Sequence, residues 1–314
     1  MHSESTSHGA RPRFGAFLAL SWLLVLAAAL WQYGFPEDYK VRWGANPAGI
    51  AHFRALFNFN PDKFSPLTYS RGFAGLLAFA MLAYGLMLFV AHRTSMQMTR
   101  GLLLAAWVFT LGFATIVPAG LSCDVYAYLA YARMAVVYGL NPHVHTQFEL
   151  ATLHDPVAEF LQWNVPSPYG PFWTQLTILL IWPVKSLSLA VQVLVLKWLA
   201  GVALLLTAQQ AAHLAEKANP GKGGLTFVAI AACPLLLIEG PGNGHNDLVM
   251  VAWLVLGVRL WQERKIHSGA LCIGLSAALK FIPFLLGPWL LWMRWVKQYP
   301  RSATTCLTKP PFQT

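Results

Sequence analysis

Long apolar segments with basic residues at their ends constrain this chain more than any other feature of its sequence. About 20 mostly apolar residues are enough for a helix to cross a bilayer. Runs that approach this length cover residues 14–31, 72–91, 101–119, 187–212, 225–239 and 247–261. Only 11% of the residues are charged and 56% are hydrophobic, whereas soluble domains carry about 25% charged residues. The sequence therefore predicts an all-α fold, a polytopic bundle of transmembrane helices.

Two further apolar runs are less regular. One covers residues 171–184, and the other covers 268–295 and is interrupted by Lys280 and Pro283. The first long run, 14–31, follows basic residues as a signal peptide would, but it is long and ends in bulky aromatic residues. We therefore expect it to be an uncleaved first span.

The charges between the apolar runs predict which loops share a side of the membrane. The connections 91–100 and 259–265 are basic, and 215–224 is weakly basic, so they are expected on the cytoplasmic side. Residues 122–170 contain one Arg, no Lys and four acidic residues, and 239–247 contains two acidic residues and no Lys or Arg. These two acidic loops are therefore expected to meet on the extracytoplasmic face.

This sidedness allows only one membrane crossing between residues 170 and 213, although that stretch is long enough for nearly two helices. We therefore expect residues 171–184 to enter the membrane and to break near Pro183 without crossing it. Irregular backbone at that depth is tolerated where it is buried in protein or lines a cavity.

The run GLSCDVYAYLAYARMAVVYGLNP, residues 120–142, places Asp124 directly after an apolar segment. A helix is expected from Asp124 to Gly139, because Gly and a following Pro are typical of a helix end. At helical spacing one face carries an apolar stripe and the other carries polar groups: Val125, Leu129, Ala132 and Val136 on the first, Asp124, Tyr128 and Tyr131 on the second. The pattern predicts an extracytoplasmic amphipathic helix in the membrane interface. A simple N-cap role for Asp124 is the alternative.

A second group of polar residues lies in GPGNGHND, residues 240–247. His245, Asn246 and Asp247 offer a donor, an amide and a carboxylate next to a membrane span. A turn whose Asn246 or Asp247 caps the next helix is the alternative interpretation. The sequence supplies no second cluster with metal-ligand spacing, so no metal site is predicted here, and no cofactor is expected; a divalent cation is not indicated.

Two more segments carry candidate binding residues. SPYGPFW, residues 167–173, contains Tyr169 and Trp173, which suit the interfacial aromatic belt, and packing is their default interpretation. Lys280 lies within an apolar run, where a charge is costly unless it reaches the surface or meets an anion. Snorkelling and a phosphate contact are both open for Lys280.

The formal charge of +10 raises the question of nucleic-acid binding. Lys and Arg lie at the ends of apolar runs and form no basic stripe with interleaved aromatic residues, so no nucleic-acid partner is expected. The four cysteines have no metal-ligand spacing. Dinucleotide, P-loop and serine-hydrolase motifs are absent from the sequence.

Taken in order, four segments resemble one family of enzymes. DVYAYLAYARMAVVYGLNPHVH, SPYGPFW, EGPGNGHNDLVMVAWLVL and GLSAALKFIPFLLGPWLL are similar to the polyprenyl-phosphate-mannose-dependent mannosyltransferases of actinobacterial type. These belong to the GT-C superfamily of integral membrane glycosyltransferases. The resemblance covers about residues 100–295 and implies a GT-C-like bundle in a bacterial-type plasma membrane.

The resemblance also implies a reaction. A hexose, mannose in the family, moves from a polyprenyl-phosphate carrier to a hydroxyl of a glycan or glycolipid acceptor on the extracytoplasmic face, by an inverting single displacement. Asp124 matches the family's catalytic acid and is the expected general base. Lys280, Arg133 and His245 are the cations expected near the leaving phosphate. His245, Asn246 and Asp247 match a polar loop that binds sugar or phosphate, and Tyr128 and Tyr169 are expected to line the sugar pocket.

The expected organisation has three parts: a cytoplasmic segment with two leading spans (1–100), a catalytic core (101–295) and a polar tail (296–314). Family members continue with more spans, so a fragment, a frameshifted product or a reduced relative is expected. The rival interpretations are a polytopic transporter or lipid-handling protein without catalysis, and an inactive truncated relative. Acidic residues gathered in loops on one face, rather than within the spans, favour an enzyme.

Overall fold

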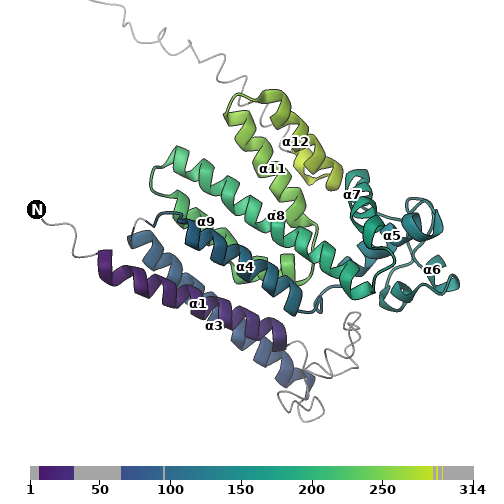
Figure 1. Ribbon diagram of the computed structural model, residues 1–314, viewed down its shortest axis with the longest axis horizontal. Helices are drawn as coiled ribbons and strands as arrows, with labels where there is room; N and C mark the ends of the chain where they lie inside the picture. The colour runs from purple at the N-terminus through teal and green to yellow at the C-terminus, as the bar shows by residue number, and fades with distance from the viewer. Residues whose placement is uncertain (1–6, 32–64, 95, 286–287, 289–291, 293–314) are drawn as a thin grey trace, which may run out of the picture.

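The computed structural model describes residues 7–31, 65–94, 96–285, 288 and 292, and every regular element among them is helical (Figure 1). The expected all-α class is confirmed. The predicted tail, 296–314, lies outside the described residues. In chain order the elements are α1 (Ser7–Trp31), α3 (Pro66–Arg93), α4 (Arg100–Ile116), α5 (Asp124–Tyr138), α6 (Glu149–Thr152), η3 (Pro156–Phe160), α7 (Pro171–Ile181), η4 (Trp182–Val184), α8 (Leu189–Ala218), α9 (Gly223–Ala231), α10 (Pro234–Leu237), η5 (Ile238–Gly242), α11 (Asp247–Gln262), α12 (Ile266–Leu279) and η6 (Ile282–Leu285).

Among the described residues, three helices are long and apolar enough to cross a membrane, within α1, α3 and α8, and the bent pair α9 and α10–η5 would make a fourth. α4, α7 and α12 are apolar but shorter. The predicted span at 225–239 is thus two helical pieces that meet at 50°. Pro234 stands at the start of the second piece, where its fixed φ suits a first turn.

The helices form a layered bundle. α1 and α3 pack side by side, α4, α8 and α9 lie next to them, and α11 and α12 form a hairpin on the other side of α8 (Figure 1). The two helices of the hairpin approach closely at Gly257 and Gly269. A Cβ added at Gly257 would lie 3.0 Å from the Gly269 carbonyl oxygen, and one added at Gly269 would lie 2.9 Å from the Gly257 carbonyl oxygen. Small residues allow membrane helices to approach in this way.

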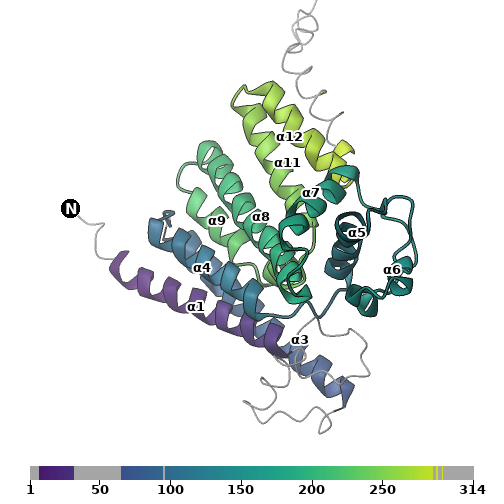
Figure 2. The same cartoon turned by 45° about the vertical axis from the view of Figure 1, so that its right-hand side comes forward.

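The loops divide between two ends of the bundle, as their charges predicted. At one end, Lys222 Nζ lies 3.4 Å from His92 Nδ1, which brings the connection 215–224 next to 91–100. At the same end, His213 Nε2 near the end of α8 lies 3.3 Å from Glu263 Oε1, which brings the connection 259–265 next to 215–224. At the other end lie α5 and α6 (Figure 2). η5 is at the same end, because Asn243 directly after it accepts a hydrogen bond from the Leu121 N–H just before α5. α8 also begins at this end, because Gln192 in its first turn donates to the Lys185 carbonyl oxygen, which α5 also contacts through Arg133. The segment 171–188 therefore starts and finishes at the same end of the bundle.

α5 forms where the sequence predicted it, and Gly139 ends it in the left-handed conformation with φ 68°. Its surroundings differ from those expected of an interfacial amphipathic helix. Every residue from Val125 to Met134 is buried, including the tyrosines of the predicted polar face. The reason is that α7, α8, η3 and the loop after α5 cover the helix on all sides, which periodicity within one helix does not reveal.

Candidate active site

Asp124 begins α5 and is the centre of the candidate site. Its carboxylate is 27% exposed and accepts a hydrogen bond of 3.5 Å from Tyr128 Oη, one helical turn further on. The N-cap position belongs to Cys123, so the N-cap alternative for Asp124 is wrong. A carboxylate at a helix N-terminus is stabilised by the helix dipole, and this one stays partly open to solvent.

His245 faces Asp124 from the loop between η5 and α11. Its Nε2 lies 3.7 Å from Asp124 Oδ2, and its Nδ1 lies 3.2 Å from Glu239 Oε2. The pKa of His245 is raised, chiefly by the hydrogen bond and charge of Glu239 and further by the charges of Asp124 and Asp247, which outweigh the effect of burial. The two acidic loops of the sequence thus meet at this imidazole.

A hydrogen-bonded chain fixes the two loops to each other. The Leu121 backbone N–H, three residues before Asp124, donates to Asn243 Oδ1 at 3.2 Å, and Asn243 Nδ2 donates to Glu239 Oε2 at 3.3 Å. Behind this chain Lys197 of α8, which is 4% exposed, donates from Nζ to the Val117 carbonyl oxygen at the end of α4. The segment before Asp124, residues 117–123, is therefore fixed by Asn243 at Leu121 and by Lys197 at Val117.

Lys280 joins the same end of the bundle from α12. It follows the last residue of that helix, and its Nζ donates to Asp247 Oδ1 at 2.6 Å. Gly170 N donates to the Leu279 carbonyl oxygen at 3.2 Å, which brings the start of α7 to the same place. Lys280 is thus at a helix end beside a carboxylate, rather than in mid-span as its apolar surroundings in the sequence indicated.

Aromatic rings form the wall behind Asp124. Tyr128 is 1% exposed and packs edge-on against Tyr169 and Trp173, with ring centroids 4.8 Å and 4.9 Å away. Burial raises the pKa of both tyrosines, and the nearby Asp124 charge contributes. A tyrosine hydroxyl is neutral at pH 7 in any case, and the raised pKa keeps these two hydroxyls as neutral donors to higher pH.

Asn246 and Arg133 are placed differently from the other candidates. Asn246 is 0% exposed and stands at the N-cap position of α11 without a side-chain cap bond. Both atoms of its side-chain amide are buried and have no hydrogen-bond partner within the described part of the chain. Arg133 points away from Asp124: its guanidinium makes a two-pronged contact with Asp155 at 2.8–3.0 Å and donates to Gln192. The structure thus brings Asp124, Tyr128, Tyr169, His245, Asp247 and Lys280 to one end region, and Arg133 belongs to a separate buried cluster.

Glu239 and Asn243 are members of the site that the sequence did not single out. Both lie in the same polar loop as His245, and the acidic character of that loop was the only signal. Their contribution depends on η5, a π-helical turn, and such turns often occur at functional sites. Among the described residues, no group of three or more His, Cys, Asp or Glu side chains is arranged to hold a metal ion.

The fold and this site define an integral membrane protein with a carboxylate–imidazole cluster at one end of a helical bundle. The chain belongs to the family described as "Alpha-(1->6)-mannopyranosyltransferase, N-terminal domain", whose model matches residues 44–296. This match reaches further toward the N-terminus than the resemblance seen in the sequence and includes α3. The mannosyltransferase resemblance is thereby confirmed at the level of the family.

One curated relative is similar over part of its length. Alpha-(1->6)-mannopyranosyltransferase A of Mycobacterium tuberculosis is 29% identical over 182 residues, which are 56% of this chain and 33% of the relative. The chain thus spans about a third of the length of the relative it matches. No solved structure matches this chain.

Proposed function

We propose that this chain transfers a hexose, with mannose as the first sugar to test, from a polyprenyl-phosphate carrier to a hydroxyl of a glycan or glycolipid. The reaction takes place on the extracytoplasmic face of a bacterial-type plasma membrane. The observation that carries the proposal is Asp124: a partly open carboxylate at the acidic end of the bundle, with His245 and the Asp247–Lys280 pair close by. Its family relatives are named for mannosyl transfer.

In the proposed step, Asp124 removes the proton of the acceptor hydroxyl as the oxygen attacks the anomeric carbon. The bond from that carbon to the phosphate oxygen breaks, and its electron pair leaves with the phosphate. A phosphate is a good leaving group, so no strong acid is required. Lys280 is the permanent cation beside Asp247 in this cluster, and it would stabilise the charge that develops on the leaving phosphate. A single displacement inverts the anomeric centre.

An apolar cavity next to the site supports a lipid-linked substrate. It has a volume of about 250 Å³, lies between α7, α8 and α11, and is lined by Phe172, Leu176, Leu199, Val202, Ala203, Leu206, Gln210, Val249, Ala252, Trp253 and Leu256. Along α8 its lining extends from Leu199 to Gln210, which is about 16 Å at 1.5 Å per residue. Two of its lining residues, Phe172 and Val249, are close in sequence to Tyr169 and Asp247, so one end of the cavity lies toward the end of the bundle that carries the polar cluster.

The donor class is tested with membranes that contain this chain. We expect labelled mannose to pass from polyprenyl-phosphate-mannose to endogenous acceptors, and no transfer from a nucleotide-linked mannose when synthesis of the lipid donor is blocked. Vector-only membranes are the control. Absence of transfer from every polyprenyl-phosphate sugar would contradict the proposal and favour a lipid-handling protein or an inactive relative.

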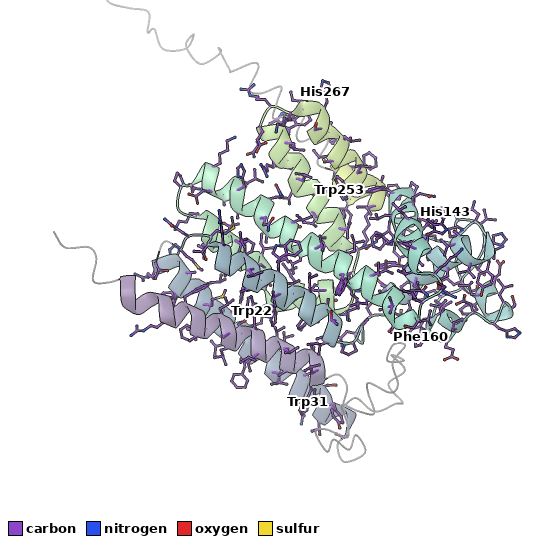
Figure 3. All side chains as sticks on the ribbon, viewed as in Figure 1. Trp22, Trp31, His143, Phe160, Trp253 and His267 are labelled. Carbon is purple, nitrogen blue, oxygen red and sulfur yellow. The ribbon has the colours of Figure 1, made fainter. Side chains whose placement is uncertain are left out.

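The proposed face is tested by thiol labelling in a background without native cysteines. A cysteine at His143, an exposed residue at the acidic end of the bundle (Figure 3), should react with an impermeant maleimide in intact cells. A cysteine at the exposed Lys217 should react only after permeabilisation. Asn243 in the polar loop is not suitable for labelling, because it is 1% exposed. Reaction of both positions in intact cells, or the reverse order, would contradict the assignment.

A further inference from the structure

Three side chains at the site lie in a sequence of contacts that leads away from Asp124. Asp124 Oδ2 is 3.7 Å from His245 Nε2, and His245 Nδ1 is 3.2 Å from Glu239 Oε2. The His245 Nε2 atom is buried and has no hydrogen-bond partner among the described residues. One nitrogen of the imidazole is thus engaged by a carboxylate, and the other faces the proposed base.

The backbone around η5 holds this arrangement. The His245 N–H donates to the Glu239 carbonyl oxygen at 3.3 Å, so the two residues are tied through both main chain and side chain. Asn243 Nδ2 fixes the Glu239 carboxylate from the other side. Gly244 has φ 76°, and a Cβ there would lie 2.9 Å from Val125 on α5. The turn therefore requires glycine both for its conformation and for its closeness to the helix that carries Asp124.

The charges that face His245 come from three elements. Asp124 lies on α5, Glu239 on η5 and Asp247 on α11, while Lys280 offsets the charge of Asp247 and Lys197 lies behind Gly244. When the Glu239 carboxylate accepts a hydrogen bond from His245 Nδ1–H, the neutral imidazole carries its lone pair on Nε2. The raised pKa of His245 makes its neutral form a stronger base than an isolated imidazole.

We propose that Glu239 and His245 form a proton-accepting pair behind Asp124, with Glu239 as a positioning residue that keeps Nε2 directed at the Asp124 carboxylate. This inference rests on the proposed function. The proton that Asp124 takes from the acceptor hydroxyl passes from Oδ2 to Nε2, which leaves Asp124 ionised and His245 as an imidazolium beside Glu239. His245 is 22% exposed and then releases one proton to solvent. The 3.7 Å gap closes in the complex or holds one water, since catalytic hydrogen bonds are often long before substrate binds.

The pair predicts a specific pH dependence of transfer. His245 must be neutral to receive the proton, so the rate falls as pH drops through the raised pKa of His245. Glu239→Gln removes the charge that raises this pKa, so we expect the acidic limb of the kcat/KM profile to move toward lower pH by about one unit. We also expect the plateau rate to fall about tenfold, because His245 is then a weaker proton acceptor.

The measurement is the pH profile of transfer from polyprenyl-phosphate-mannose by membranes with the native chain or Glu239→Gln. The matched control is Glu149→Gln, which removes a carboxylate from another Glu–His pair, His145 Nδ1 to Glu149 Oε2 at 2.8 Å, in the loop before α6. A second variant, His245→Ala, should lose activity and regain part of it when imidazole is added. A purely structural role for Glu239 or His245 would give neither the shifted limb nor the imidazole rescue.

The outcomes separate this inference from the proposed function. An acidic limb that moves in Glu239→Gln but not in Glu149→Gln, together with imidazole rescue of His245→Ala, supports the pair. An unchanged acidic limb, or a shift of the alkaline limb instead, overturns it, because the latter would mean that His245 works as an imidazolium. If Asp124→Asn is inactive while Glu239→Gln keeps the native profile, only the inference fails. If Asp124→Asn keeps full transfer, the role of Asp124 as the base fails together with the inference. If native membranes transfer from no polyprenyl-phosphate sugar, the proposed function itself fails.

Discussion

Membranes that contain Asp124→Asn are expected to transfer the labelled sugar about 10²–10⁴ times more slowly than membranes with the native chain. The amide has nearly the same shape and can still accept the hydrogen bond from Tyr128, but it cannot take a proton from the acceptor hydroxyl. Donor binding should change little, so the loss should appear in kcat and not in the KM for the lipid donor. The measurement is initial transfer rate against donor concentration at equal protein levels.

Two controls isolate the chemistry of Asp124 from its structure. Glu149→Gln neutralises another carboxylate at the same end of the bundle and should leave the transfer rate near that of the native chain. Asp124→Asn should keep the native elution profile in detergent, because the side chain is partly exposed and pairs with no Lys or Arg in the described part of the chain. Equal rates for Asp124→Asn and the native chain would remove Asp124 as the base.

The second large effect is expected on stability, from Arg133→Met. Arg133 and Asp155 are buried, with side chains 8% and 0% exposed, and Tyr138 Oη donates to the same carboxylate at 2.8 Å. Removing one partner of a buried ion pair leaves the other charge uncompensated and costs about 3–5 kcal/mol. We expect the midpoint of thermal unfolding in detergent to fall by about 10 °C.

The matching control is Arg93→Met, which removes an exposed guanidinium that lies 5.2 Å from the Phe89 ring centroid. It should change the unfolding midpoint by no more than a few degrees. The double variant Arg133→Met, Asp155→Asn should be more stable than Arg133→Met alone, because it no longer buries an unpaired carboxylate. An unfolding midpoint for Arg133→Met equal to that of Arg93→Met would mean that this ion pair is not a stabilising element.

Sequence patterns predicted part of the candidate site and misplaced one of its residues. Asp124 and the polar loop were found because a carboxylate and a GHND segment stand out between apolar runs, and their charge placed both at one end of the bundle. The family resemblance placed Arg133 at the same site, as one of the cations expected near the leaving phosphate. Its actual partner, Asp155, comes from the following loop, and only the folded chain shows that the two meet.

Glu239 illustrates the opposite failure. It is six residues before His245, and side chains six residues apart do not contact each other in a regular helix or strand. The π-helical turn and the positive φ of Gly244 bring the two side chains within 3.2 Å. No periodic pattern in the sequence encodes such a turn, although its glycines and prolines indicate that the backbone departs from a regular helix.

The sequence by itself determined the helical class, the membrane character, the division of the loops between two ends and the place where α5 begins and ends. These features follow from local composition, because the length of an apolar run, the charge of a loop and a terminating glycine each determine the structure of the residues next to them. The tertiary structure alone decided that residues 125–134 of α5 are buried, that Arg133 pairs with Asp155 in the core and that Glu239 lies against His245. The burial of α5 and the pairing of Arg133 depend on contacts between distant segments, such as Arg133 with Asp155, 22 residues apart, and Asp124 with His245, 121 residues apart. The contact of Glu239 with His245 depends on the π-helical turn between them.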